Sequence, residues 1–255
     1  MEELLSGGNT SGGVVKVGST VRRPTGPWTP QVHELLRHLE SSGFEGAPRV
    51  LGIDEQGREI LTYIDGVVVW PSHFDLLAED PALAEVSGVI RRYHEAVADF
   101  RLLDRHAWSD RGSDPQGPAE LLCHNDLAPW NLVRGTQGWA FIDWDLAAPG
   151  RRSWDLAWAL LSLVPLMPDT QLSLQETRHR IGVFREGYGA AILPIDILDV
   201  AAERCGREAA LIQELGSLGQ PPYARLLAEG HFEIWASAEE HIRRRAPEWQ
   251  TALVE

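Results

Sequence analysis

Hydrophobic residues in the first 65 positions fall in short runs separated by glycine-containing turns. Residues 14–17 form one β-branched run, and residues 20–23 form another after a turn at Gly18-Ser19. A second pair of runs lies in residues 49–64, on either side of Glu55-Gln56-Gly57. Short β-branched runs bounded by turn residues are typical of strands joined as hairpins. The pattern therefore predicts a small β-rich unit at the N-terminus.

One helix is expected between these pairs of strands. Thr29 can cap its start, and Pro30 suits its first turn because the missing N–H of proline is not needed there. The apolar positions that follow recur at helical spacing: Val32, Leu35, Leu36 and Leu39. The pattern ends near Gly43.

Beyond Gly66 the hydrophobic spacing changes to three and four residues, which is the period of a helix. The first such series is Leu83, Val86, Ile90, Tyr93, Val97 and Phe100. A loop rich in proline, glycine and aspartate is expected at 104–118, then a strand-loop-strand block at 121–143, then long helices after Ser153. The chain is thus predicted to be α+β, with a β-rich lobe at 1–65 and a larger helical lobe at 66–255.

Charge limits the classes of partner. The 255 residues carry a formal net charge of −14, and nucleic-acid binding requires clustered lysine and arginine. The cluster Arg243-Arg244-Arg245 is interpreted as the basic end of a helix. We therefore expect no nucleic-acid partner, whereas a cationic small molecule is compatible with the charge.

The N-terminus and the cysteines bear on location. The chain begins Met-Glu-Glu-Leu-Leu, without a basic stretch before an apolar run, and has two cysteines, Cys123 and Cys205. These features predict a reduced, cytoplasmic protein. The apolar stretch Leu156 to Met167 is shorter than the roughly 20 residues that cross a bilayer, so no membrane span is expected.

The strand-loop-strand block contains the candidate chemistry. His124, Asp126 and Asn131 occur in the order His-x-Asp, four residues, Asn, and Asp143 ends the next apolar strand. Phosphoryl transfer needs a carboxylate beside the attacking hydroxyl and oxygen ligands for magnesium. We therefore predict Asp126 as the catalytic base and Asn131 and Asp143 as Mg²⁺ ligands, with His124 as a brace of the loop.

Each of these residues also has a structural interpretation. A buried His124 can be a hydrogen-bonded core residue, Asn131 a turn former and Asp143 a cap. The spacing of all four together favours the catalytic interpretation.

The block resembles the aminoglycoside phosphotransferase and choline kinase-like family. The resemblance lies in His124-Asn125-Asp126 through Asn131, in Ile142-Asp143-Trp144-Asp145 and in Trp154-Asp155-Leu156-Ala157. It implies a two-lobed protein-kinase-like fold, use of ATP or GTP with Mg²⁺, and a role for Asp155 as an internal brace beneath the catalytic loop.

The same resemblance implies nucleotide contacts in the first lobe. The glycine-rich start would cover the phosphates, with Gly7, Gly8 and Ser11 as candidate binding residues. The segment ending in Thr62 and Ile64 resembles the hinge whose backbone groups bind the purine. Backbone recognition does not distinguish ATP from GTP.

A cation on the third strand is also implied. Arg22 is the predicted match, with Arg23 and Lys16 as competitors. Relatives hold this cation with a helix glutamate, but the corresponding position here is Val32, with His33 and Glu34 beside it.

The leading function is therefore a phosphotransferase that moves the γ-phosphate of a nucleoside triphosphate to a small-molecule hydroxyl. An aminoglycoside or another amine-bearing compound is among the expected acceptors. One alternative is a catalytically impaired, kinase-like nucleotide-binding regulatory protein. Another is a metal-dependent hydrolase with His124, Asp126 and Asp143 as ligands, which the lack of further clustered histidines disfavours.

Three glutamates bear on the acceptor. Glu229, Glu233 and Glu240 would fall within roughly 40° of one another on a single helix, forming a carboxylate stripe. Such a stripe either attracts a cationic acceptor or is a solvated face with Glu240 paired to Arg243 or Arg244. Phe232 and Trp235 are expected to pack against neighbouring elements.

Overall fold

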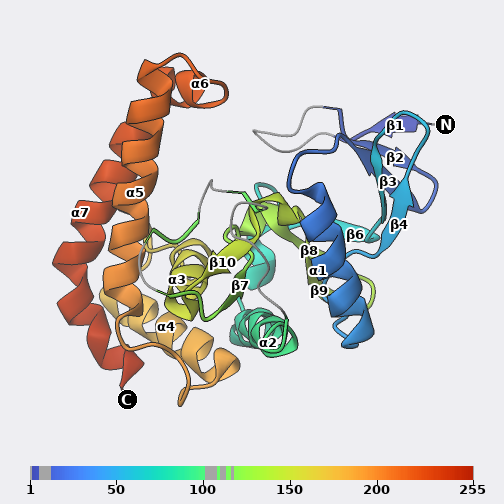
Figure 1. Ribbon diagram of the computed structural model, residues 1–255. Helices are drawn as coiled ribbons and strands as arrows, with labels where there is room; N and C mark the ends of the chain where they lie inside the picture. The colour runs from blue at the N-terminus through green and yellow to red at the C-terminus, as the bar shows by residue number, and fades with distance from the viewer. Residues whose placement is uncertain (1, 6–12, 101–107, 110–112, 116–117, 255) are drawn as a thin grey trace.

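The computed structural model describes residues 2–5, 13–100, 108–109, 113–115 and 118–254. Figure 1 shows a β-rich part at the N-terminal end and a helical part that ends in two long neighbouring helices. The predicted α+β fold with a small β-rich lobe and a larger helical lobe is confirmed.

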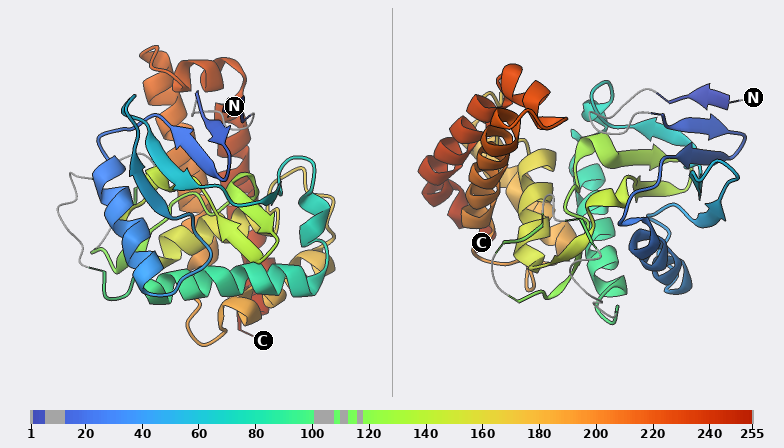
Figure 2. Two further views of the ribbon diagram at one scale, coloured as in Figure 1. Left: turned by 90° about the vertical axis from the view of Figure 1, so that its right-hand side faces the viewer. Right: turned by 45° about the horizontal axis from the view of Figure 1, so that its top comes forward.

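The first lobe is a five-stranded antiparallel sheet in the order β1-β2-β3-β5-β4. Its strands are β1 (Glu2–Leu4), β2 (Val15–Val17), β3 (Thr20–Arg23), β4 (Val50–Ile53) and β5 (Glu59–Thr62). The helix α1 (Thr29–Ser41) has Pro30 in its first turn and buries the four predicted apolar residues. The sheet and α1 lie together at one end of the molecule (Figures 1 and 2).

Two small sheets lie between this lobe and the long helices. β6 (Gly66–Val68), β8 (Leu132–Gly135) and β9 (Gly138–Phe141) form an antiparallel sheet in the order β6-β8-β9. β7 (Leu121–Cys123) pairs with β10 (Ala148–Gly150). The predicted boundary at 65/66 falls between the last strand of the first sheet and the first strand of the second.

The rest of the second lobe is helical. Its α-helices are α2 (Asp80–Ala96), α3 (Arg152–Leu163), α4 (Leu174–Tyr188), α5 (Ile197–Ser217), α6 (Tyr223–Ala228) and α7 (His231–Trp249). Short 3₁₀ turns are η1 (Phe74–Leu77), η3 (Pro129–Asn131), η4 (Trp144–Leu146) and η5 (Gln250–Leu253). Figures 1 and 2 show α5 and α7 side by side at the end of the molecule far from the first sheet.

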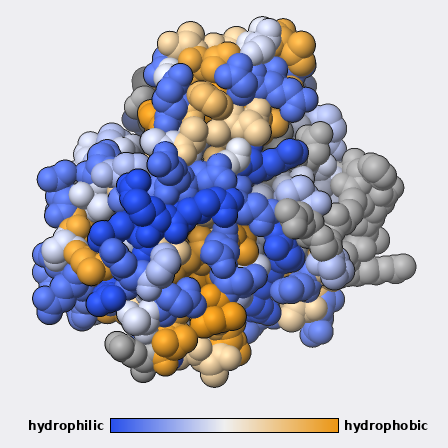
Figure 3. Space-filling model, turned by 90° about the vertical axis from the view of Figure 1, so that its left-hand side faces the viewer, coloured by the Kyte–Doolittle hydropathy of each residue, from blue (hydrophilic) through white to orange (hydrophobic). Residues whose placement is uncertain are grey.

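The outer surface near α5 and α7 is mixed in character. Figure 3 shows this side as mainly hydrophilic, with apolar residues at its upper end and a second group toward its lower end. Leu218, which follows α5, is 68% exposed, and Ile234 in the first turn of α7 is 45% exposed.

α2 ends earlier than its hydrophobic pattern predicts. The apolar spacing continues to Phe100, but the helix ends at Ala96. The ring of His38 binds the Ala96 carbonyl oxygen at 2.7 Å, so that oxygen is already engaged by a side chain of α1. Val97 and Phe100 still pack in or against the core.

The core centres on α3, in which ten of the twelve residues are buried. The apolar stretch from Leu156 is therefore the interior helix of a globular lobe. Among the described residues, none of the helices has both the length and the apolarity that a bilayer crossing requires. Cys123 and Cys205 are both buried and free.

Candidate active site

The catalytic loop begins where β7 ends, and it is held by one buried carboxylate. Asp155, in the first turn of α3, accepts the backbone N–H of His124 at 2.9 Å and that of Asn125 at 2.7 Å. His94 Nε2 lies 3.2 Å from the same carboxylate. Burial by itself would raise the pKa of Asp155, but these hydrogen bonds hold it below its usual value. The expected bracing role of Asp155 is confirmed.

His124 also braces the loop. Its ring is fully buried against Trp144, with ring centroids 4.4 Å apart, and its Nδ1 accepts the backbone N–H of Asp126 at 3.2 Å. Burial lowers the pKa of His124, which keeps the ring neutral and able to accept this bond. The predicted bracing role of His124 is confirmed.

Two residues of the site have left-handed backbone conformations. Asn125 has φ 67° and Asp143 has φ 60°, and they are the only described non-glycine residues with positive φ. Such conformations are uncommon outside glycine and concentrate at functional sites. Asn125 is held by its bond to Asp155 and by its side-chain amide, which donates to the Leu146 carbonyl oxygen at 2.8 Å.

Asp126 is the partly exposed carboxylate of this loop. The Trp130 indole N–H donates to Oδ1 and Oδ2 of Asp126 at 3.2 and 3.1 Å, and the Trp158 indole N–H donates to Oδ1 at 3.0 Å. Burial raises the pKa of Asp126, and the hydrogen bonds from the two indoles oppose that rise. These bonds fix the direction of the carboxylate.

Asn131 joins Asp126 to the strand that leads to Asp143. Its side-chain amide donates to Oδ2 of Asp126 at 2.8 Å and to the carbonyl oxygen of Asp126 at 3.1 Å. Its own backbone carbonyl accepts the N–H of Ile142 at 2.9 Å. The three residues predicted to carry the chemistry are therefore brought together around Asn131.

Asp143 lies against the first lobe. The Arg23 guanidinium on β3 donates to Oδ1 of Asp143 at 3.0 Å and also to Asp145. The same arginine donates to Glu59, which is 1% exposed and whose Oε2 lies 2.8 Å from Nε2 of His33. This network connects the two lobes.

The charge of Arg23 is well compensated. Burial by itself would lower the pKa of Arg23, but Asp145, Asp143 and Glu59 raise it above its usual range. Burial also raises the pKa of Asp145 to about 6, although Arg23 acts in the opposite direction.

The predicted cation Arg22 points elsewhere. Its guanidinium donates to the Thr20 hydroxyl at 2.5 Å and lies 3.8 Å from Asp54. Lys16 lies over the ring of Tyr63, 3.7 Å from the centroid. Of the three candidates, Arg23 contacts the predicted metal ligand Asp143. Arg23 also binds Glu59 of β5, which contacts His33 of α1, whereas a glutamate of the helix was expected to hold the cation.

The other predicted nucleotide contacts are only partly described. Gly7, Gly8 and Ser11 lie outside the described residues. Thr62 ends β5, where its N–H donates to the Arg49 carbonyl oxygen and its hydroxyl accepts the Arg49 N–H. Ile64 lies between β5 and β6, in the connection between the lobes.

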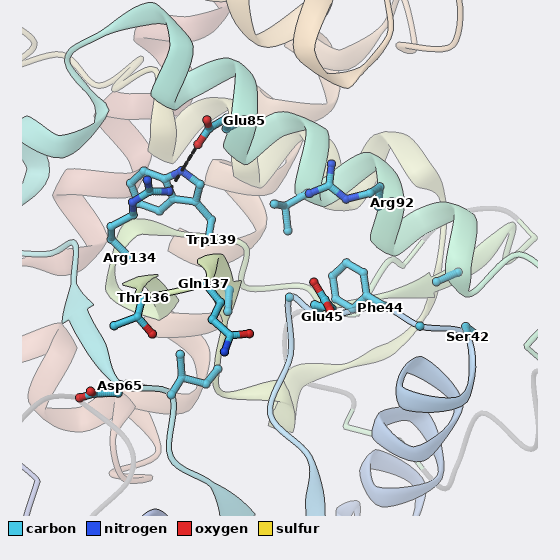
Figure 4. A pocket seen from close by; sticks show the side chains of 18 of the residues that line it. Ser42, Phe44, Glu45, Asp65, Glu85, Arg92, Arg134, Thr136, Gln137 and Trp139 are labelled. Carbon is cyan, nitrogen blue, oxygen red and sulfur yellow. Dashed lines mark hydrogen bonds and ion pairs between the residues drawn. The ribbon is translucent and has the colours of Figure 1, made fainter.

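A groove of about 1170 Å³ lies beside that connection. Its lining comes from the end of α1, from α2, from residues 63–65 and from the β8–β9 hairpin. Figure 4 shows Glu85 on α2 bound to the hairpin, where the Trp139 indole donates to it at 3.0 Å. Neither the predicted base nor either predicted metal ligand lines this groove, whereas Ile64, a predicted purine contact, does.

The predicted magnesium ligands suit a metal that is shared with phosphates. The Asp143 side chain is 31% exposed, and the Asn131 amide bonds described above use its nitrogen and leave its side-chain oxygen available. No cluster of three or more His, Cys, Asp or Glu side chains suited to a metal occurs among the described residues. This donor set fits Mg²⁺, which takes few protein carboxylates and completes its shell with phosphates and water. It does not fit the metal-dependent hydrolase considered above.

Sequence reasoning missed the tryptophans and the arginine that support this loop. Arg204 on α5 is 5% exposed and donates to the carbonyl oxygens of Trp154 and Asn125 at 2.8 and 2.9 Å. Its guanidinium lies 4.7 Å from the ring centroids of Trp154 and Trp158. The spacing of Trp154 and Trp158, one turn apart on an apolar helix, was the available signal.

Replacing Asp155 by Asn should destabilise the protein. The substitution places an amide where two backbone N–H groups and a histidine now meet a carboxylate, so a buried donor loses its acceptor. Such a loss costs about 2–3 kcal/mol, which corresponds to a fall in Tm of roughly 5–10 °C. Thermal unfolding measures it, with Asp169→Asn at an exposed position as the control. Equal melting temperatures for the two variants would contradict the bracing role.

The fold and the site define a class. A five-stranded lobe, a helical lobe and a loop carrying Asp126 and Asn131 before a strand that ends at Asp143 are the features of kinase-like phosphotransferases. The model of the family described as "Phosphotransferase enzyme family" matches residues 92–193.

A curated protein extends this likeness. The trifolitoxin immunity protein of Rhizobium leguminosarum bv. trifolii is 35% identical over 196 residues, which cover 73% of each chain. The chain belongs to the phosphotransferase enzyme family. Its structural neighbours include choline and ethanolamine kinases and aminoglycoside phosphotransferases.

Solved structures agree on the fold. A choline/ethanolamine kinase family protein from Mesorhizobium loti has a TM-score of 0.64 at 16% identity, covering 99% of this chain and 92% of that one. The amicoumacin kinase hAmiN, in complex with AMP-PNP, Ca²⁺ and Ami, has a TM-score of 0.61 at 12% identity, covering 97% and 89%. The gentamicin complex of APH(2″)-IIa has a TM-score of 0.55 at 14% identity, covering 98% and 93%. The predicted kinase-like fold is confirmed.

Proposed function

We propose that this protein transfers the γ-phosphoryl group of ATP or GTP to a hydroxyl of a small molecule, with Mg²⁺ as cofactor. The arrangement around Asn131 carries this proposal, because its side chain binds the predicted base and its backbone binds the residue before the predicted metal ligand. Membership of the phosphotransferase family supports it. The predicted cytoplasmic location remains part of the proposal.

The residues have distinct roles in this step. Asp126 would orient the acceptor hydroxyl and take its proton as the oxygen forms its bond to the γ-phosphorus. The bond between the γ-phosphorus and the bridging oxygen breaks, and the nucleoside diphosphate leaves with that electron pair. Asn131 and Asp143 would hold Mg²⁺, which neutralises charge on the phosphate oxygens.

The nucleotide would lie between the lobes. Thr62 and Ile64 remain the proposed purine contacts, and Gly7, Gly8 and Ser11 the proposed phosphate cover. Two structural neighbours were solved with AMP-PNP or GDP, which supports nucleotide use in this class.

The acceptor is proposed from the relatives only as a class. The structural neighbours include a choline/ethanolamine kinase family protein, an amicoumacin kinase and a phosphotransferase solved with gentamicin, and the curated relative is named for immunity to trifolitoxin. A hydroxyl-bearing toxic compound is therefore a reasonable acceptor, and its phosphorylation would protect the cell.

The main alternative is a nucleotide-binding protein without turnover. Isothermal titration with ATP and with GTP, each with and without Mg²⁺, tests the part of the proposal that both alternatives share. We expect a nucleoside triphosphate to bind more tightly when Mg²⁺ is present. Absence of binding under all four conditions would contradict both.

Adjacent arginines give a matched test of the phosphate cation. We propose Arg23 in place of the predicted Arg22, because Arg23 lies against Asp143 and Arg22 against Asp54. Arg23→Lys keeps the charge but removes the planar guanidinium, and should weaken nucleotide binding about tenfold, since a hydrogen bond to a charged group contributes about 1.5–3 kcal/mol. Arg22→Lys should change the affinity by less than about twofold. A larger loss of nucleotide affinity in Arg22→Lys than in Arg23→Lys would identify Arg22 as the cation that binds the phosphates.

A further inference from the structure

Three tryptophans lie together beside the predicted base, and we call them the tryptophan corner: Trp130, Trp158 and Trp235. Two of them, Trp130 and Trp158, bind Asp126 directly. The rings of Trp130 and Trp158 have centroids 6.4 Å apart in an edge-on arrangement. Trp235, on α7, stacks on Trp158 with centroids 5.0 Å apart and an interplanar angle of 29°. Elements η3, α3 and α7 thus contribute one ring each.

Hydrogen bonds join the tryptophan corner to the predicted catalytic base. Trp130 and Trp158 both donate to Asp126, so their rings lie beside the carboxylate that the acceptor hydroxyl must reach. Trp130 is 39% exposed and Trp235 is partly buried, whereas Trp158 is 6% exposed. Trp130 therefore offers exposed ring surface directly beside Asp126, and Trp235 is linked to the same place through Trp158.

The charge beneath the corner is positive. Arg204 lies 4.7 Å from the Trp158 ring centroid, and the two hydrogen bonds described for it go to carbonyl oxygens. Burial lowers the pKa of Arg204, but the buried guanidinium remains charged because an arginine pKa is far above neutral. The ring of Trp158 is therefore packed by Arg204 and by Trp235, and of the three rings Trp130 and Trp235 are the ones with exposed surface.

The predicted carboxylate stripe does not complete a cation site. Glu229 lies before α7 starts, and Glu240 is exposed and 3.7 Å from Arg244. Glu233 and Trp235 are two residues apart, so their side chains point about 200° apart on the helix. Since Trp235 stacks on Trp158, Glu233 points away from the corner. The structure supports the solvated-face interpretation of these glutamates.

We propose that the acceptor carries a flat, unsaturated ring system beside its reactive hydroxyl, and that Trp130 and Trp235 bind that ring. This inference rests on the proposed function, because it assumes that Asp126 receives an acceptor hydroxyl. Aromatic side chains bind flat rings by offset or edge-on stacking, and indole offers the largest surface for it.

Binding of defined probes tests the ring preference. The probes are 2-(2-naphthyl)ethanol, its saturated decahydronaphthyl analogue, choline and gentamicin. Titration of the whole protein, followed by ligand-observed NMR with and without Mg²⁺ and AMP-PNP, measures each affinity. We expect the naphthyl alcohol to bind at least about tenfold more tightly than its saturated analogue and than choline.

Variants of Trp235 locate the site. Trp235→Ala should weaken binding of the naphthyl alcohol about tenfold, and Trp235→Phe should restore part of it because a ring is retained. Ile234→Ala, at an exposed neighbouring position of α7, is the matched control and should bind the probe as the wild type does. Thermal unfolding of each variant shows that the fold is retained, and the phenylalanine variant gives the answer if the alanine variant does not fold.

Tighter binding of choline or gentamicin, or equal binding of the naphthyl and decahydronaphthyl alcohols, would overturn the inference. Equal affinities of the naphthyl probe for Trp235→Phe, Trp235→Ala and wild type would also overturn it. Because the probes are titrated with and without nucleotide, failure of nucleotide binding would count against the proposed function and leave the ring preference measurable.

Discussion

Replacement of Asp126 by Ala is expected to reduce the turnover number by about 10²–10⁴, the range of a lost general base. The neighbouring Asn131 side chain presents its amide nitrogen on this side and therefore cannot accept the proton in place of Asp126. Nucleotide affinity should stay within about twofold, because a base beside the acceptor does not hold the phosphates. Steady-state kinetics with a fixed acceptor and calorimetric nucleotide titration measure the two quantities.

This substitution also leaves two indole N–H groups without their carboxylate. A moderate loss of stability is therefore expected, and thermal unfolding must show that the variant is folded at the assay temperature. Asp169→Ala, at an exposed position, is the control for loss of a carboxylate as such. Turnover of Asp126→Ala within about tenfold of the wild type would remove Asp126 from the role.

Replacement of Asp143 by Asn should abolish the effect of magnesium on nucleotide binding and lower turnover at least about 100-fold. Changes to groups that only support metal ligands already lower metal affinity or activity by about 10–100-fold, and Asp143 is proposed as a direct ligand. A neutral amide oxygen in its place binds a divalent cation much more weakly. Titration of nucleotide at several Mg²⁺ concentrations measures the change.

Asp145 provides a matched control for this variant. Asp143 and Asp145 both contact Arg23, so Asp145→Asn disturbs the same arginine without removing the proposed ligand. We expect Asp145→Asn to keep the magnesium dependence. The opposite result, with magnesium dependence lost in Asp145→Asn and kept in Asp143→Asn, would move the ligand to Asp145.

Much of the fold could be predicted from local patterns. The strands β2 to β5, α1 and the strand-loop-strand block depend on spacing within a few residues, and the structure contains them, whereas β1 was not predicted. The predicted end of α2 was wrong: the helix ends at Ala96, where the carbonyl oxygen contacts the ring of His38, 58 residues away in the chain. Hydrophobic periodicity has no information about such a contact.

The choice between Arg22 and Arg23 depends on one position in a strand. Successive side chains of a strand point to opposite faces, so a change of one residue reverses the direction. Arg23 shares a face with Val21, whereas Arg22 shares one with Thr20, to which it is bonded. The alternation was visible in the sequence, but the contact of Arg23 with Asp143, 120 residues away, was not.

The surroundings of Asp126 could likewise be predicted only in part from the sequence. The motif identified the carboxylate, and its bond to Asn131 spans only five residues. The contacts of Arg204 and Trp235 join α5 and α7 to the loop and to α3, and they depend on how the helices pack. Neither residue belongs to the motif, so only the structure brings them to the site.

The most direct test of the proposed activity is consumption of nucleoside triphosphate followed by ³¹P NMR. Wild-type protein, Asp126→Ala and Asp143→Asn are each incubated with Mg²⁺ and ATP or GTP, with and without a hydroxyl-bearing acceptor. We expect the wild type to form nucleoside diphosphate together with a phosphomonoester of the acceptor, and neither variant to do so above background. Nucleotide that binds the wild type with Mg²⁺ but is consumed no faster than in the two variants would contradict the proposed phosphotransferase and favour the binding protein without turnover.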